Sequence, residues 1–268
     1  MPIMLEGGCF VTGLKEGDPG GGDGVRIWRH IHRGAGAQSI SMRVLEFPRG
    51  RSGPLRNARC DEVLYVVEGS GTLILDGHPL EIEPDIGIYV RPGSSFSVLN
   101  RSADPLTLVS AQCPDPGPTS ALRGTEGAAT SGLRATRATA PDGPDRGMYP
   151  MVRLRDRVSE TTGDRWYRVL VDKEVGCRES TQFVGSIPPG RAPDHFHHYE
   201  EALCILVGTG RMWSGDTSTP IQAGSCVFLP RGQIHCVENT GSGDLRLLGV
   251  FHPAGSPAVR YSADERAG

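Results

Sequence analysis

Residues 62–77 read EVLYVVEGSGTLILDG, and residues 201–216 read EALCILVGTGRMWSGD. Each stretch begins with a glutamate, continues as a short apolar run, and then places two glycines around a single residue. Two further stretches, RPGSSFSVLN (91–100) and PRGQIHCVEN (230–239), recur at the same offset of 139 residues. A constant offset over this length indicates an internal duplication, because chance similarity does not keep one spacing.

The composition and rhythm of both repeats predict an all-β fold. Apolar runs of four to eight residues alternate with glycine, proline, aspartate and asparagine, which is typical of short strands joined by turns. The chain has 37 glycines and 21 prolines, and no segment shows a convincing amphipathic helix. We therefore expect two tandem antiparallel β barrels or sandwiches, at residues 20–113 and 150–256.

The segment between the two repeats, residues 114–149, has a different composition. It is rich in proline, glycine, alanine and threonine and poor in large apolar side chains. A connection of this length is typical of a mobile linker, of a lid, or of an arm that lies over a neighbour. The sequence does not choose among these three.

Charge and cysteine content limit the classes of partner. The net charge is −3, with 28 basic and 31 acidic residues dispersed along the chain, so we expect neither a nucleic-acid nor a membrane partner. The N-terminus has no basic, apolar leader and no apolar run reaches 18 residues, which predicts a cytoplasmic protein. Seven cysteines without CxxC spacing are expected to be mostly reduced and buried.

The segment APDHFHHYEEALCILVGTG (192–210) carries three histidines and two glutamates. His195 and His197 are two residues apart, so a strand points both side chains to one face, and Glu201 shares their parity. His235 stands in a second strand-like stretch, 224–239. If that stretch lies opposite the first, three imidazoles and one carboxylate converge, and such a donor set is typical of a divalent transition-metal site.

These same residues carry a resemblance to a known family. PPGRAPDHFHHYEEALCILVG (188–208) and GSCVFLPRGQIHCVEN (224–239) resemble the two cupin motifs, although Gly190 lies one residue closer to the first histidine than usual. The resemblance implies a bicupin of two double-stranded β-helix, or jelly-roll, barrels. It also implies one divalent metal ion per chain, with Fe²⁺ as first choice and Mn²⁺, Ni²⁺, Cu²⁺ or Zn²⁺ as alternatives, and a homodimer.

The first repeat lacks the metal-binding pattern. At the offset of 139 the ligand positions hold Arg56, Ala58, Glu62 and Phe96, of which only the glutamate is a metal ligand. We expect no metal in this half. Arg56 and Glu62 are instead expected to form an ion pair or to hold a small polar ligand, unless the first barrel is purely structural.

Three functions are compatible with this site. The first is an Fe(II)-type dioxygenase acting on a small organic molecule, with Glu201 also serving as a catalytic proton acceptor. The second uses the metal as a Lewis acid without redox change, in an isomerase, decarboxylase, hydrolase or cyclase. The third is a cupin that binds a small ligand without catalysis. In each case Ile205 and Val237 are the predicted apolar wall for the substrate.

Overall fold

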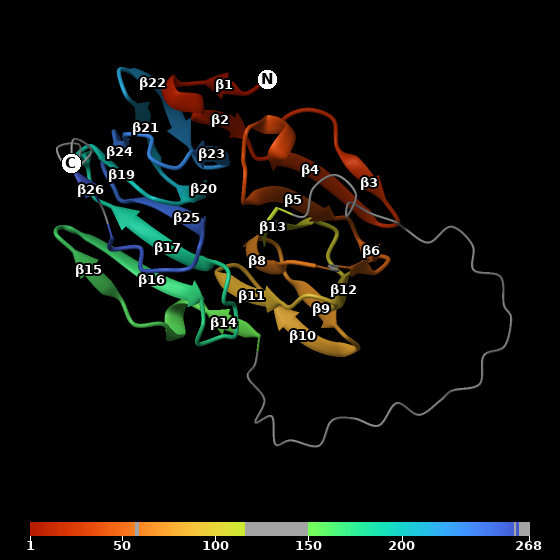
Figure 1. Cartoon of the computed structure of the whole chain (residues 1–268). Helices are drawn as coiled ribbons and strands as arrows, with labels where there is room; N and C mark the ends of the chain where they lie inside the picture. The colour runs from red at the N-terminus through yellow and green to blue at the C-terminus, as the bar shows by residue number, and fades with distance from the viewer. Residues whose placement is uncertain (57–58, 116–149, 260, 263–268) are drawn as a thin grey trace, which may run out of the picture.

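The computed structural model describes residues 1–56, 59–115, 150–259 and 261–262, and over these residues the chain is built almost entirely of strands. Figure 1 shows two β barrels side by side, one from each repeat. The predicted all-β fold of two tandem jelly-roll barrels is therefore confirmed. The predicted linker, 114–149, lies outside the described residues except for its first two positions.

The first barrel consists of two sheets. One has the strand order β14-β11-β8-β13-β5-β4-β3, and the other has the order β10-β9-β12-β6 with β7 also paired to β12. The strands are β3 (Gly20–Gly22), β4 (Val25–Ile31), β5 (Ser41–Phe47), β6 (Gly50–Arg51), β7 (Leu55–Arg56), β8 (Asp61–Glu68), β9 (Gly71–Leu75), β10 (His78–Ile82), β11 (Ile86–Val90), β12 (Ser95–Asn100), β13 (Leu106–Cys113) and β14 (Met151–Arg153).

The second barrel repeats this plan. Its larger sheet has the order β1-β2-β23-β20-β25-β17-β16-β15, and its smaller sheet has the order β22-β21-β24-β19-β26 with β18 paired to β24. The strands are β1 (Ile3–Met4), β2 (Phe10–Gly13), β15 (Glu160–Thr162), β16 (Arg165–Val171), β17 (Thr181–Ile187), β18 (Gly190–Arg191), β19 (His195–Phe196), β20 (Glu200–Val207), β21 (Thr209–Ser214), β22 (Thr217–Gln222), β23 (Ser225–Leu229), β24 (His235–Asn239), β25 (Leu245–His252) and β26 (Tyr261–Ser262).

Two segments pair with the barrel of the other repeat. The N-terminal strand β2 lies antiparallel to β23 of the second barrel. Conversely, β14 lies antiparallel to β11 of the first barrel. The expected domain limits, 20–113 and 150–256, stay a prediction, and the pairing adds that the two repeats exchange strands.

Each barrel has its own hydrophobic core, and a third cluster joins the two barrels. That third cluster combines Val63 and Tyr65 of β8 with Ala202 and Cys204 of β20, together with Phe10 and Phe228. The rings of Phe10 and Phe228 lie 5.4 Å apart between centroids. Because the shared cluster is apolar and fully buried, removing it from water stabilises the contact between the barrels.

All seven cysteines are among the described residues; all are buried and none forms a disulfide. No helix of the described part of the chain is long and apolar enough to span a bilayer. The three short 3₁₀ turns that are described, Glu6–Gly8, Arg33–Ala35 and Leu154–Asp156, are connections between strands.

Candidate metal centre

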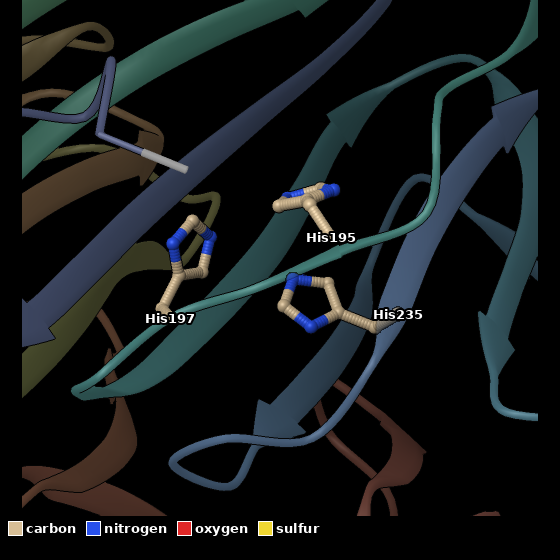
Figure 2. A group of neighbouring side chains, drawn as sticks. All are labelled: His195, His197 and His235. Atoms are coloured by element: carbon tan, nitrogen blue, oxygen red, sulfur yellow. The ribbon is translucent and has the colours of Figure 1, made fainter. Parts of the chain in front are cut away.

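Three histidines meet inside the second barrel. His195 of β19 and His235 of β24 are direct partners in the antiparallel register, and His197 follows two residues after His195. Their nearest ring nitrogens all lie within 4.8 Å of one another, and Figure 2 shows the three imidazoles around one common space. Two donors on one ion with metal–donor bonds of about 2.1 Å are roughly 3 to 4 Å apart. Small ring rotations therefore bring the three nitrogens within reach of one cation.

The backbone holds two of these rings in a defined tautomer. His195 Nδ1 lies 3.0 Å from the carbonyl oxygen of Pro193, and His235 Nδ1 lies 2.8 Å from the carbonyl oxygen of Gln233. A carbonyl only accepts, so each Nδ1 carries the proton and donates it. The Nε2 lone pair of each ring is then available for a metal, which is the usual way in which a protein orients a histidine ligand.

The charge state of the site also suits metal binding. Burial and the neighbouring His195 lower the pKa of His235 to about 3. An imidazole must be neutral to act as a ligand, and the lowered pKa keeps His235 neutral at neutral pH.

Glu201 reaches the histidines from the opposite sheet. Its Oε2 atom lies 3.7 Å from Nε2 of His197, and both side chains are buried. Glu201 belongs to β20, where it pairs with Leu229 of β23 and Phe251 of β25. The two sheets of the barrel thus deliver three imidazoles and one carboxylate to one place, and that donor set fits a divalent transition metal. The assignment of these four residues as ligands stays a prediction.

The four side chains line one cavity of about 100 Å³. Its other walls are mostly apolar and include Tyr167, Phe183, Leu203, Leu229, Val237 and Leu247. Val237, a predicted substrate contact, is therefore at the cavity. Ile205, the other predicted contact, lies in the core cluster of the barrel and is not part of the cavity wall. It follows Glu201 and Leu203 on the same face of β20, but further along the strand.

Sequence reasoning missed two residues of this site. Tyr199 stacks on His197 with ring centroids 4.5 Å apart, and on its other side it stacks on Phe251 at 4.3 Å. Its parity with His197 and Glu201 was the available signal. Arg165 of β16 also lines the cavity, with its Nε atom 3.7 Å from Asp164. Nothing local marks Arg165, because β16 reaches the cavity only through the sheet order.

The expected ion pair of the first barrel has a different partner. Glu62 is completely buried, and its Oε1 atom accepts hydrogen bonds from Arg43 Nη2 at 2.7 Å and from Ser110 Oγ at 2.5 Å. Gln112 Nε2 donates to the other oxygen at 3.1 Å. Arg56 is exposed on β7, so its pairing with Glu62 was wrong. Arg43 lies beside Ser110 in the β5–β13 register, which places its guanidinium in the barrel.

Two jelly-roll barrels, one of them with a histidine-lined cavity, define a bicupin. The family model "Cupin domain" matches residues 43–111 and 183–251, and the chain belongs to this family. An oxalate-binding protein from Thermotoga maritima is 39% identical over 85 residues, which are 31% of this chain and 70% of that protein. Auxin-binding protein 1 from Arabidopsis thaliana is 30% identical over 86 residues, which are 28% of this chain and 43% of that protein.

Solved structures share the fold of the whole chain. A putative glyoxylate-induced protein from Pseudomonas aeruginosa superposes with a TM-score of 0.69 at 17% identity, over 93% of this chain and 90% of that one. A mutant of oxalate decarboxylase from Bacillus subtilis gives a TM-score of 0.70 at 14% identity, over 95% of this chain and 79% of that one. At these identities the likeness shows the fold alone.

Proposed function

We propose that this chain is a metal-dependent bicupin enzyme that acts on a small organic molecule, and that its reaction is a dioxygenation at an Fe(II)-type centre in the second barrel. The observation that carries the proposal is the convergence of His195, His197, His235 and Glu201 on one cavity with mostly apolar walls. When bound there, Fe²⁺ supplies a Lewis acid and a redox-active ion with positions open to substrate and dioxygen.

The protein's own residues have separate tasks in this proposal. The backbone carbonyls of Pro193 and Gln233 fix the proton of two imidazoles on Nδ1. Glu201 offsets the positive charge of a bound cation and accepts a proton from a substrate hydroxyl that approaches Oε2. Tyr199 holds the ring of His197 by stacking on its face, so the orientation of that ring survives when the site is empty.

The apolar walls favour dioxygenation over the alternatives. Phe183, Leu203 and Leu247 exclude water from the cavity and match a substrate with an apolar body. Dioxygen is itself apolar and enters such a cavity without loss of hydration. Arg165 supplies one cation at the wall, which suits a carboxylate or another anionic group on that substrate.

A non-redox lyase reaction, above all decarboxylation, is the second candidate. It is favoured by the names of two relatives, the oxalate-binding protein and the oxalate decarboxylase, and by the position of Arg165. The third candidate is a cupin that binds a small ligand without turnover. Its support is the 39% identity to the oxalate-binding protein, because that name states binding only.

One experiment separates the three. The metal-free protein is reconstituted anaerobically with Fe²⁺ or Mn²⁺ and is then given oxalate, 2-oxo acids and ortho-diols, all of which offer adjacent oxygens. Dioxygen uptake in step with substrate loss is expected. Release of CO₂ without dioxygen uptake would establish the second candidate instead, and saturable binding without product would establish the third.

A further inference from the structure

A second cavity lies where the two barrels meet, away from the histidines. It encloses about 430 Å³ and is formed by the turn 83–85 of the first barrel, by residues 153–155, and by side chains of β16 and β25. In Figure 1 this is the region between the barrels where β14 lies beside β11 and β16. Because its walls come from both repeats, the cavity exists only when the barrels are docked.

Four arginines line this cavity: Arg153, Arg155, Arg168 and Arg246. Two carboxylates also line it. Glu83 lies 3.6 Å from Arg153 and 3.5 Å from Arg155, and Asp85 lies 3.2 Å from Arg246. Four guanidinium groups against two carboxylates leave two positive charges on the lining. Such a balance attracts an anion of two negative charges.

Three of these guanidinium groups have an unused donor. The Nε atoms of Arg153, Arg168 and Arg246 are buried and have no hydrogen-bond partner within the part of the chain that is described. Buried nitrogen donors are normally satisfied, so a group of three at one cavity indicates a missing acceptor. Oxygen atoms of a phosphate or carboxylate are the acceptors that the guanidinium fork fits best.

The cavity is also partly ordered in advance. Arg168 donates from Nη1 to the carbonyl oxygen of Leu154 at 3.1 Å, and its guanidinium carbon lies 5.4 Å from the centroid of the Trp166 ring. Asp85 is held in turn by the hydroxyl of Tyr65. These contacts fix side chains that would otherwise lose freedom on binding a ligand, which favours affinity.

We propose that this cavity, between the two barrels, binds a small dianion whose charge is carried on oxygen atoms, such as a phosphate group or a dicarboxylate. The site is separate from the metal centre, and it does not depend on the reaction proposed there. Trp166 lines both cavities, so its indole reports on the arginine cavity without any metal.

The test measures binding of inorganic phosphate and of succinate to the metal-free full-length chain, by calorimetry and by tryptophan fluorescence. Sodium chloride at matched ionic strength is the blank, because screening alone acts on any surface charge. We expect saturable binding of at least one dianion. Phosphate alone would identify a phosphate group, and succinate alone a dicarboxylate.

Two matched variants make the test specific. Arg168→Gln removes a lining guanidinium and is expected to weaken binding about tenfold or more. Arg157→Gln is the control, because Arg157 is also half-buried and also donates to a backbone carbonyl, that of Leu170 at 3.0 Å, but does not line the cavity. Should Arg168→Gln not fold, Arg155→Gln replaces it, since 72% of the Arg155 side chain is exposed; its expected loss is severalfold. Absence of saturable binding, or equal binding by the lining variant and the control, would overturn the proposal.

Discussion

Asp61 and Glu200 occupy equivalent positions of the two repeats, and each anchors its barrel to a loop of the other. Asp61 Oδ2 accepts hydrogen bonds from the backbone N–H groups of Arg178 and Glu179, both at 3.1 Å. Glu200 accepts from the N–H groups of Gln38 and Ser39, both at 2.7 Å. The receiving loops are also related by the offset of 139. The repeats therefore contact each other reciprocally, as two copies of one chain would.

Replacing Glu200 is expected to loosen this contact. Glu200→Ala leaves buried N–H groups without an acceptor and should lower the free energy of unfolding by about 2–3 kcal/mol, as measured by urea denaturation. Glu174→Ala is the control, because the Glu174 side chain is 72% exposed. A change no larger than that of the control would show that the anchor adds nothing to stability.

The ion pair of the first barrel should behave as a buried pair. Glu62→Leu leaves the guanidinium of Arg43 buried without its carboxylate, with an expected loss of roughly 3–5 kcal/mol of stability. The double variant Arg43→Met/Glu62→Leu should recover much of that loss, because no uncompensated charge remains. Denaturation of all three proteins measures this. Equal losses in the single and double variants would contradict the expectation.

Metal content should depend on the histidines of the second barrel alone. His195→Ala and His235→Ala are expected to abolish retention of the metal, with little change in folding, because the barrel core is independent of the cation. His198→Ala should keep it, since His198 is exposed and contacts Tyr261 and Phe196 instead. Elemental analysis should give one ion per wild-type chain. Unchanged metal content in the first two variants refutes the ligand assignment.

The cysteines should react slowly in the folded protein. Burial raises the pKa of the Cys9 thiol to about 12 and that of Cys177 to about 11. The thiolate is the reactive form, and a thiol with a pKa near 11 is only ~0.1% ionised at pH 8. Iodoacetamide should therefore modify all seven cysteines in denaturant but almost none in the native state, as counted by mass spectrometry. Rapid native labelling of Cys9 or Cys177 would speak against the burial described.

The sequence alone determined the fold class and the set of residues that gather in the second barrel. Strand periodicity is local, so the spacing of His195 and His197 already places both on one face, and the offset of 139 aligns the two repeats. The same parity would have identified Tyr199. These properties depend on a few neighbouring residues, and neighbouring residues are what a sequence shows directly.

Only the tertiary structure decided which distant residues meet. Glu62 is equidistant in pattern from several arginines, and the β5–β13 register selected Arg43 rather than Arg56. The exchange of β2 and β14 between barrels, and the arginine cavity that the docking creates, likewise have no local signal. The physical reason is that packing and sheet order join segments more than a hundred residues apart, where each contact depends on the position of the whole barrel.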